Sequence, residues 1–384
     1  MRRLTLLTLV GLAACAGPSP DHPPIDWEAV CGAACAAPPV QVDVGKGSSC
    51  VRYAGGAVLC WGDRRGTNWT NSTEFRPPLA PYQPRPPIEL ATTGAIDLSI
   101  SGVYGCVVKE DASLHCWGDR YLALGTAAGS PVPVAVPGAT DVVALGVGTA
   151  VCAVRADGAI MQPVHELIVN DEAGAVACEV GDGFACRILA DESLECWGSN
   201  AFGKLGRGDR GNERGLSPVL FDHPVAAIAL GQSHACALTV DGEVWCWGSN
   251  RQGQLGAETP ESVSTVPVRA DIDRVVAIRA GGWDTCAVRD DGQLFCWGND
   301  DFGLRGGIET AIPTLVPGAD DVIDVDIAAN HGCLIRGSGE VACWGSEAYG
   351  ALGQERASVP FGQLQEVTGL PHHGEWPADE VSEE

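Results

Sequence analysis

The feature that most restricts the fold of this 384-residue chain is a cysteine pair that recurs six times. In each copy nine residues separate two cysteines, and Trp-Gly follows the second one directly. A unit of about fifty residues with strand-type sequence, repeated along a chain, is one supersecondary element copied around a ring or along a stack. The six pairs are Cys50 and Cys60, Cys106 and Cys116, Cys186 and Cys196, Cys236 and Cys246, Cys286 and Cys296, and Cys333 and Cys343.

The sequence within one unit predicts four strands. Residues 275–281 form an apolar, β-branched run that is typical of a strand buried on both faces. Residues 285–289 and 293–298 flank a turn and form a hairpin, and residues 312–317 form a short strand that proline confines to an edge. Four strands per unit describe a propeller blade. The six repeated tryptophans, at positions 61, 117, 197, 247, 297 and 344, are expected to pack between neighbouring blades.

A seventh unit is marked by Cys152, which stands where a first cysteine belongs. We therefore predict an all-β, seven-bladed propeller of four-stranded blades over residues 39–370. A closed ring leaves no unpaired edge at its ends. Residues 361–367 are expected to supply an outer strand next to residues 40–44, which brings the two ends of the propeller together.

The position of each cysteine pair fixes the geometry of its hairpin. Cys286 and Cys296 centre on Asp291, which implies a three-residue turn whose third residue is left-handed, a conformation that favours glycine. Five units have glycine there, whereas Ala112 and Glu192 depart from the pattern and predict strained or differently built turns. Directly opposed cysteines suit disulfides, and a spacing of nine residues does not suit zinc knuckles. We thus predict a disulfide within each of the six pairs.

The remaining cysteines complete the pairing. The chain has 17 cysteines, and setting aside Cys15, near the start of the chain, leaves an even number. Cys31 and Cys35 are close enough in sequence to bridge each other. Cys152 lacks its usual mate because Gln162 occupies that place, so Cys178 is its expected partner. With the six hairpin bonds, this predicts an oxidising compartment and eight disulfides.

The first residues resemble the signal of a bacterial lipoprotein. Arg2 and Arg3 precede an apolar run, and small residues then lead to Cys15. This resemblance implies cleavage before Cys15 and a lipid on its sulfur, and Ala16 in the next place favours an outer-membrane or surface location. A plain secretory signal, giving a periplasmic or secreted protein, is the alternative. Residues 16–38 are predicted to be a Pro/Ala-rich linker, and residues 371–384 an acidic tail.

The formal net charge of −25 argues against a nucleic-acid partner, because the phosphate backbone would be repelled. The sequence contains no Gly-x-Ser-x-Gly, no phosphate-binding loop and no His-Glu-x-x-His. We therefore expect no cofactor, no metal and no catalytic residue. The protein is expected to be a monomer that contacts the membrane only through the lipid at Cys15.

Residues 230–256 contain Leu-Gly-Gln-Ser-His-Ala-Cys, then Asp-Gly-Glu-Val-Trp-Cys-Trp-Gly, and finally Gly-Gln-Leu-Gly. These motifs, in this order, resemble the repeat of the regulator of chromosome condensation family. The resemblance extends over about residues 40–370. It implies a propeller but not an activity, because the family includes a guanine-nucleotide exchange factor, a plant photoreceptor and a β-lactamase inhibitor.

One set of candidate binding residues lies just before the first cysteine of a unit, at the residue two positions before it or next to that residue. His234, Asp284 and His331 hold this position in three adjacent units, and Trp283 adjoins it. Histidine and carboxylate from neighbouring turns can bind a metal ion, or act as a base and the group that orients it. The alternative is that each histidine hydrogen-bonds within the structure.

A second set lies in an insertion over residues 63–90 between the first two units. It is rich in proline and brings basic and aromatic residues into an acidic protein, and long insertions on a rigid scaffold often carry recognition. The third unit is also degenerate, which neutral drift explains equally well. The candidates in the insertion are Arg64, Arg65, Trp69, Arg76 and Arg85.

Together these features predict a lipid-anchored binding or scaffold module of the bacterial envelope with a protein or glycan partner. One alternative is an inhibitor of an extracellular enzyme. A second alternative is an enzyme or metal site at His234, Asp284 and His331.

Overall fold

The computed structural model describes residues 38–62, 87–90, 92–102, 104–118, 129–161, 174–211, 215–300, 310–346, 350–353, 363–367 and 370. The predicted signal segment, the linker up to residue 37, most of the insertion and the acidic tail lie outside these residues. So do Cys15, Cys31 and Cys35, and with them the predicted lipid site and the bridge between Cys31 and Cys35. Among the described residues, no helix has the length and apolar character needed to cross a membrane.

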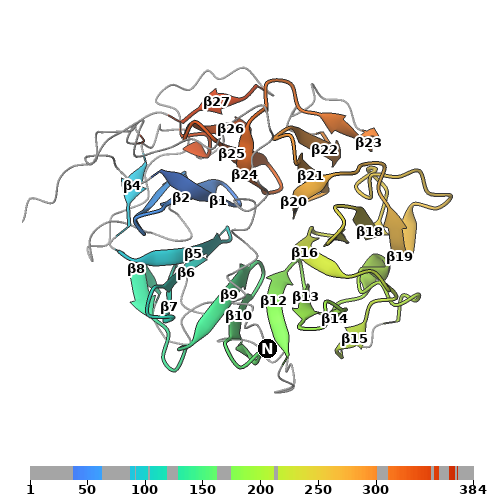
Figure 1. The fold of residues 1–384 in the computed structure, drawn as a ribbon, viewed down its shortest axis with the longest axis horizontal. Coiled ribbons are helices and arrows are strands. Elements are labelled where there is room, and N and C mark those ends of the chain that lie inside the picture. The colour runs from blue at the N-terminus through green and yellow to red at the C-terminus, as the bar shows by residue number, and fades with distance from the viewer. Residues whose placement is uncertain are drawn as a thin grey trace, which may run out of the picture.

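Seven antiparallel sheets surround a central axis and confirm the predicted seven-bladed propeller (Figure 1). Blades 1 and 2 contain β1 (Pro39–Gly45), β2 (Ser48–Tyr53), β3 (Val58–Gly62), β4 (Ile88–Glu89), β5 (Ala95–Ile100), β6 (Tyr104–Lys109), β7 (Leu114–Gly118) and β8 (Ser130–Ala135). Blades 3 and 4 contain β9 (Val142–Val147), β10 (Val151–Arg155), β11 (Ile160–Met161), β12 (Ala175–Val180), β13 (Phe184–Leu189), β14 (Leu194–Gly198), the 3-10 helix η3 (Ala201–Gly203) and β15 (Ser217–Pro218).

The remaining three blades repeat the same order. They contain β16 (Val225–Leu230), β17 (His234–Thr239), β18 (Val244–Ser249), β19 (Val263–Arg269), β20 (Val275–Gly281), β21 (Asp284–Arg289), β22 (Leu294–Gly298), β23 (Thr310–Leu315), β24 (Val322–Ile327), β25 (His331–Arg336), β26 (Val341–Gly345) and β27 (Gln365–Glu366). The first strand of each blade is innermost. Blade 3 has three strands among its described residues, and the other six blades have four.

The six predicted hairpin disulfides are all present. In each of these blades the two cysteines face each other on the second and third strands, with 4.0 to 4.1 Å between their Cα atoms. The bonds join Cys50 to Cys60, Cys106 to Cys116, Cys186 to Cys196, Cys236 to Cys246, Cys286 to Cys296, and Cys333 to Cys343.

The seventh disulfide differs from the other six. As predicted, Cys152 bonds to Cys178, but the first lies on β10 and the second on β12. The bond therefore joins blade 3 to blade 4 covalently. The hairpin turns also agree with the prediction, since Ala112 and Glu192 adopt left-handed φ angles of 60° and 68°.

Buried tryptophans hold neighbouring blades together, as predicted. Trp297 belongs to blade 6 but packs in an apolar cluster made mostly of residues from blade 5. Its indole N–H donates to the Gln254 carbonyl at 2.9 Å. Trp247 makes the same bond to the carbonyl of Lys204 at 2.9 Å. The indole body is thus packed while its polar N–H is satisfied.

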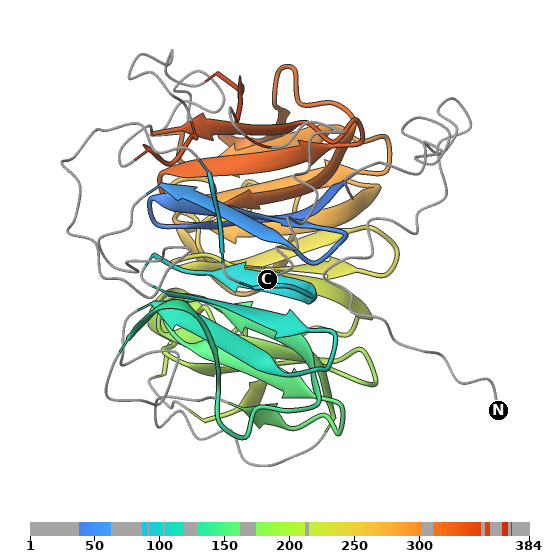
Figure 2. The same ribbon diagram turned by 90° about the vertical axis from the view of Figure 1, so that its left-hand side faces the viewer.

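The ring closes with contacts of the same kind. Figure 2 shows blade 1 between blades 7 and 2. The indole N–H of Trp61 donates to the Ala351 carbonyl at 2.8 Å, so blade 7 contacts blade 1 as blade 5 contacts blade 6. One detail of the prediction is corrected: β27 pairs with β26 and not with residues 40–44. Val367, just beyond β27, packs into the core that contains Val42.

A buried histidine adds a polar bond across this closure. The Nε2 atom of His331 lies 2.8 Å from the hydroxyl oxygen of Ser49, and that hydroxyl donates to the Ala351 carbonyl. Because the hydroxyl has one proton, the histidine is the donor. The same arrangement joins blades 5 and 6, where Nε2 of His234 lies 2.9 Å from the Thr285 hydroxyl, which donates to Gln254.

We predict that His331→Ala destabilises the ring closure. The substitution leaves the buried Ser49 hydroxyl without its donor, and the loss of such a bond costs about 1 to 3 kcal/mol. Unfolding in denaturant of His331→Ala, Ser49→Ala and the double variant measures the coupling between the two side chains. Strictly additive effects would contradict the bond as a source of stability.

Candidate functional site: the central channel

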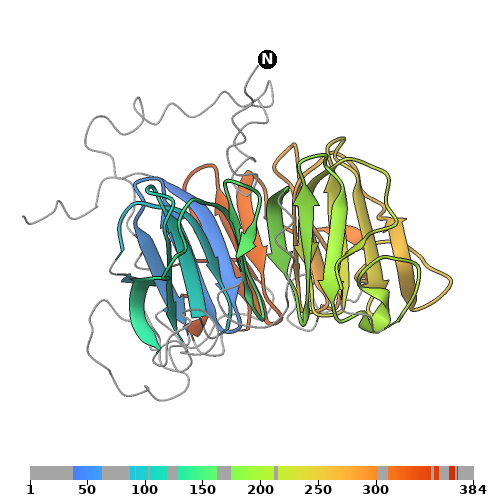
Figure 3. The same cartoon turned by 90° about the horizontal axis from the view of Figure 1, so that it is seen from below.

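A cavity of about 470 Å³ occupies the centre of the ring, and all seven innermost strands contribute to its wall (Figure 3 shows the ring from the side). Antiparallel pairing places one inner-strand residue opposite the first cysteine of every blade. These seven residues form one level of the channel. They are Asp43, Ser99, Gly146, Glu179, Ala229, Arg279 and Asp326.

A second level of the channel is formed by the residues that stand two positions earlier on each inner strand. These residues are polar in three adjacent blades and apolar in the other four. Blades 7, 1 and 2 contribute Asp324, Gln41 and Asp97. Blades 3 to 6 contribute alanine in every case, at positions 144, 177, 227 and 277. The channel therefore combines a charged wall with a small-residue wall.

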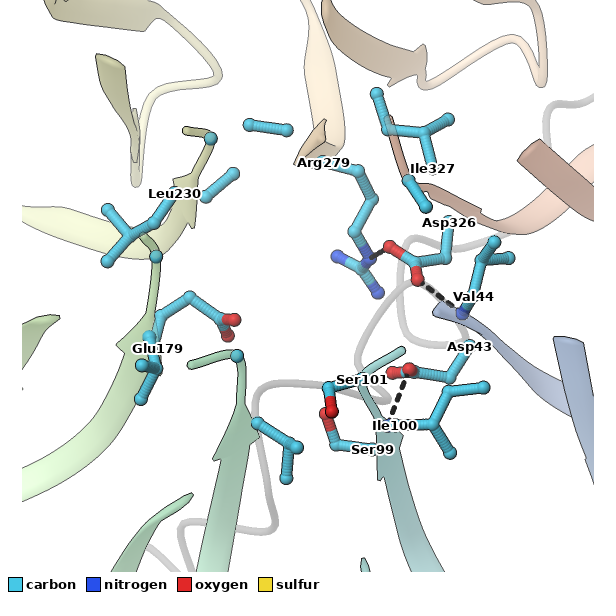
Figure 4. Close-up of a pocket in the computed structure, with 18 of the residues that line it drawn as sticks. Asp43, Val44, Ser99, Ile100, Ser101, Glu179, Leu230, Arg279, Asp326 and Ile327 are labelled. Atoms are coloured by element: carbon cyan, nitrogen blue, oxygen red, sulfur yellow. Dashed lines mark hydrogen bonds and ion pairs between the residues drawn. The ribbon is translucent and has the colours of Figure 1, made fainter. Parts of the chain in front are cut away.

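Arg279 is the positive centre of the charged wall (Figure 4). Its guanidinium lies 3.3 Å from Asp324 and 3.7 Å from Asp326, and Nη1 donates to the Ile278 carbonyl at 2.9 Å. Burial alone would lower the pKa of this guanidinium. The surrounding carboxylates outweigh burial and raise the pKa, so Arg279 stays charged.

Carboxylates of this cluster also accept hydrogen bonds from the main chain of the next blade. Asp326 accepts from the Val44 N–H at 2.7 Å, and Asp43 accepts from the Ile100 N–H at 2.8 Å (Figure 4). Burial raises the pKa of Asp326 to about 7 despite Arg279. Burial, together with the negative charge of Asp326, raises the pKa of Asp43 well above its ordinary value.

Glu179 comes from blade 4 and faces the cluster from the other side of the channel (Figure 4). Burial raises its pKa to about 8; the charge of Arg279 lowers it, while Asp326 and Asp97 raise it further. Two carboxyl groups of the channel, Glu179 and Asp326, thus titrate near neutral pH. No group of three or more His, Cys, Asp and Glu side chains in the described ranges could hold a metal ion.

The candidate residues His234, Asp284 and His331 therefore do not form a metal-binding cluster. Both histidines are buried between blades, and burial lowers the pKa of each to about 3. Nδ1 of His331 lies 3.1 Å from Oδ1 of Asn330, but Nε2 donates to Ser49, whereas in a catalytic triad the serine donates to the histidine. Ser49 is also wholly buried, which leaves no room for a substrate.

A signal in the sequence could have identified the partners of the two histidines. Only two blades have a hydroxyl residue directly before the first cysteine, namely Ser49 in blade 1 and Thr285 in blade 6. The blades that precede these two in the ring are the ones with His331 and His234. The pairing of histidine with hydroxyl across blades therefore predicts an interblade bond and not a ligand site.

The other candidates have different outcomes. Trp283, in the turn between β20 and β21, is 43% exposed and is available for binding. Arg64, Arg65, Trp69, Arg76 and Arg85 lie outside the described residues. The sequence analysis did not identify Asp43, Glu179 and Arg279, although each stands opposite a first cysteine and could be found by counting along the hairpin.

We predict that the protein becomes less stable as the pH rises from about 7 to about 9, where the buried His234 and His331 are neutral in both the folded and the unfolded chain and the raised carboxyl pKa values decide the sign. Glu179 has an ordinary pKa of 4.5 when unfolded and of about 8 when folded. Between these two pKa values the folded protein holds a proton on Glu179 that the unfolded chain releases. The contribution of Glu179 to the free energy of unfolding is therefore complete below pH 4.5 and is lost as the pH rises past about 8. The pKa of Asp326, raised from 3.8 to about 7, acts in the same direction.

Glu179→Gln should reduce this pH dependence and stabilise the protein near pH 9 by about 1 to 3 kcal/mol, because the variant carries no charge there. The exposed Glu258→Gln removes the same formal charge and serves as the control. The unfolding free energy from denaturant titrations at several pH values provides the measurement. Equal slopes in the wild type and Glu179→Gln would refute the assignment.

Two family models match the chain, both for the regulator of chromosome condensation (RCC1) repeat. One matches residues 225–254 and 275–304, and the other matches residues 196–238 and 241–288. No curated protein sequence matches the chain significantly.

Solved structures with the same fold include human WBSCR16, with 16% identity, a TM-score of 0.53 and coverage of 86% of this chain and 83% of that one. Yeast RCC1 (Prp20), bound to Kap60, has 18% identity, a TM-score of 0.51 and coverage of 85% and 74%. The ectodomain of the Physcomitrella patens receptor kinase CR4 has 21% identity, a TM-score of 0.50 and coverage of 79% and 72%. At these identities the similarity concerns the fold. The matches identify RCC1 repeats within residues 196–304, and the seven-bladed ring has the fold of RCC1-type repeat propellers.

Proposed function

We propose that this protein is a lipid-anchored binding module of the bacterial envelope that holds a partner protein on its rigid ring. The observation that carries the proposal is the set of seven disulfides in the described part of the chain. Disulfides in such number persist in oxidising compartments and are rare in the cytosol. The resemblance of residues 1–15 to a lipoprotein signal supports the same compartment.

The fold supports binding as the role. RCC1-like propellers are typically protein-binding or scaffold modules, and yeast RCC1 (Prp20) was crystallised with Kap60. In this chain the ring is held by covalent bonds within blades and by buried tryptophans between them. A scaffold of this kind loses little conformational entropy when it binds, which favours affinity. The complex of yeast RCC1 (Prp20) with Kap60 favours a protein partner over the glycan that the sequence also allowed.

We predict that Cys15 receives the lipid. Cells that express the wild-type chain should incorporate radiolabelled palmitate into it, and it should sediment with membranes. Cys15→Ala should abolish the label and release the protein, because no acyl chain then holds it to the bilayer. Cys31→Ala retains the signal and serves as the control. An unlabelled, soluble wild-type protein would rule out the anchor.

We also predict that the mature protein has almost no free thiols. Alkylation of the denatured, unreduced protein followed by mass spectrometry should leave the fourteen described cysteines unmodified, because each is in a disulfide. Extensive alkylation in protein isolated from its native host would place the chain in a reducing compartment and overturn the proposal.

A further inference from the structure

The innermost strand of every blade contains a β-bulge at the same place. In each case the pairing with the second strand skips one residue, which is the second residue of β1, β5, β9, β12, β16, β20 and β24. All seven skipped residues are aliphatic, and we call them the collar. The collar residues are Val40, Ile96, Val143, Val176, Ala226, Val276 and Ile323.

The collar residues are accessible, and in blades 1, 2, 3 and 7 both residues beside the collar residue are buried. Ile96 is 42% exposed, although Ala95 and Asp97 on either side of it are buried. Val143 and Ile323 are exposed to a similar degree, and none of the other four collar residues is fully buried. Exposed aliphatic residues at scattered positions are ordinary, but a contiguous apolar patch on a soluble protein usually marks a binding surface.

Main-chain hydrogen bonds locate the collar at one mouth of the channel. In blades 2 to 7 the residue before the collar residue donates its N–H to the hairpin turn of the preceding blade, as Val275 donates to Gly242 at 3.0 Å. In blade 1 this residue is Pro39, which has no N–H to donate. The collar thus lies where the inner strands begin, on the face of the ring that carries these turns. Ala226, one of its members, lines the channel itself.

Exposed carboxylates surround this mouth. Five of the seven hairpin turns have an exposed aspartate at the same position, at residues 111, 157, 191, 241 and 291. Arg155 and Arg289 lie 3.7 Å from two of them, Asp157 and Asp291. For Asp111 and Asp191, hydrogen bonds from the following serine lower the pKa, so both stay ionised. An apolar centre within a charged rim is the usual arrangement of a protein interface.

We propose that the collar receives a loop of a basic partner protein, in which an aliphatic or aromatic side chain stands next to lysine or arginine. The apolar side chain covers the collar, and the cation meets the aspartates of the rim. The formal net charge of −25 favours a basic partner as well. The same carboxylates disfavour an anionic bilayer as the occupant. This inference rests on the proposed binding function and specifies its surface and partner.

A displayed library of cyclic twelve-residue peptides, selected on the purified full-length chain, tests the collar. We expect the selected peptides to combine an apolar residue with lysine or arginine, and the double variant Ile96→Ser with Ile323→Ser to weaken their binding about tenfold or more. The control is Ile312→Ser with Leu315→Ser, which removes two comparably exposed residues from the outer strand β23 and should leave binding nearly unchanged. Unfolding midpoints confirm that both double variants fold.

A second readout needs no variant. A benzophenone placed at the apolar position of a selected peptide should crosslink to collar residues of the wild-type chain. Peptides that bind the collar variant as well as the wild type, or crosslinks confined to the face that carries Trp283, would overturn the inference. Collar-dependent sedimentation with phosphatidylcholine/phosphatidylglycerol vesicles, without any collar-dependent peptide, would also overturn it. The assay uses purified protein, so failure of lipid attachment at Cys15 does not affect its outcome.

Discussion

The structure depends on a covalent bond between directly opposed residues in the middle of the blades. With 4.0 to 4.1 Å between the Cα atoms of each hairpin pair, the disulfide permits a single register of the second and third strands. A slip by one residue would turn the two cysteines to opposite faces of the sheet. Since the first cysteine also faces the innermost strand, the same bond identifies the residue of each blade that stands at one level of the channel.

Between blades the restraints are mostly noncovalent. At three junctions, those made by Trp61, Trp247 and Trp297, an indole N–H donates to a loop carbonyl of the preceding blade, so the closure between blades 7 and 1 uses the same bond as the junction between blades 5 and 6. The ring therefore closes without sharing a strand between its ends. The junction of blades 3 and 4 is the exception. Gln162 has removed the usual mate of Cys152, and the bond to Cys178 makes this junction covalent.

Much of this fold could be predicted because residues close together in the sequence determine it. The spacing of the cysteines gives the hairpins, the repeat gives the number of blades, and Ala112 and Glu192 stand where a left-handed residue is required. The channel was harder to predict, because its chemistry joins residues that only the closed ring brings together. Glu179 and Arg279 belong to blades 4 and 6, and each looks like an isolated charge in an apolar strand. His234 and His331 were considered as a metal or catalytic site for a related reason. The hydroxyl group that each of them bonds lies in the next blade, which the sequence of a single repeat does not show.

The charged residues of the channel and the aliphatic residues of the collar have different roles, because the former join blades and the latter are accessible to a partner. The carboxylates of Asp324 and Asp326 accept hydrogen bonds from the main-chain N–H groups of Val42 and Val44. These bonds join blade 7 to blade 1, where the chain provides no continuous connection. Arg279 then compensates the charge of Asp324 and Asp326. Asp43 accepts a hydrogen bond from the Ile100 N–H in the same way, so the charged wall joins blade 1 to blade 2 as well as to blade 7. The collar is different, because it repeats in all seven blades, including those joined by ordinary chain connections. Ring closure alone therefore does not account for seven accessible aliphatic side chains around one mouth of the channel, whereas a partner that covers them does.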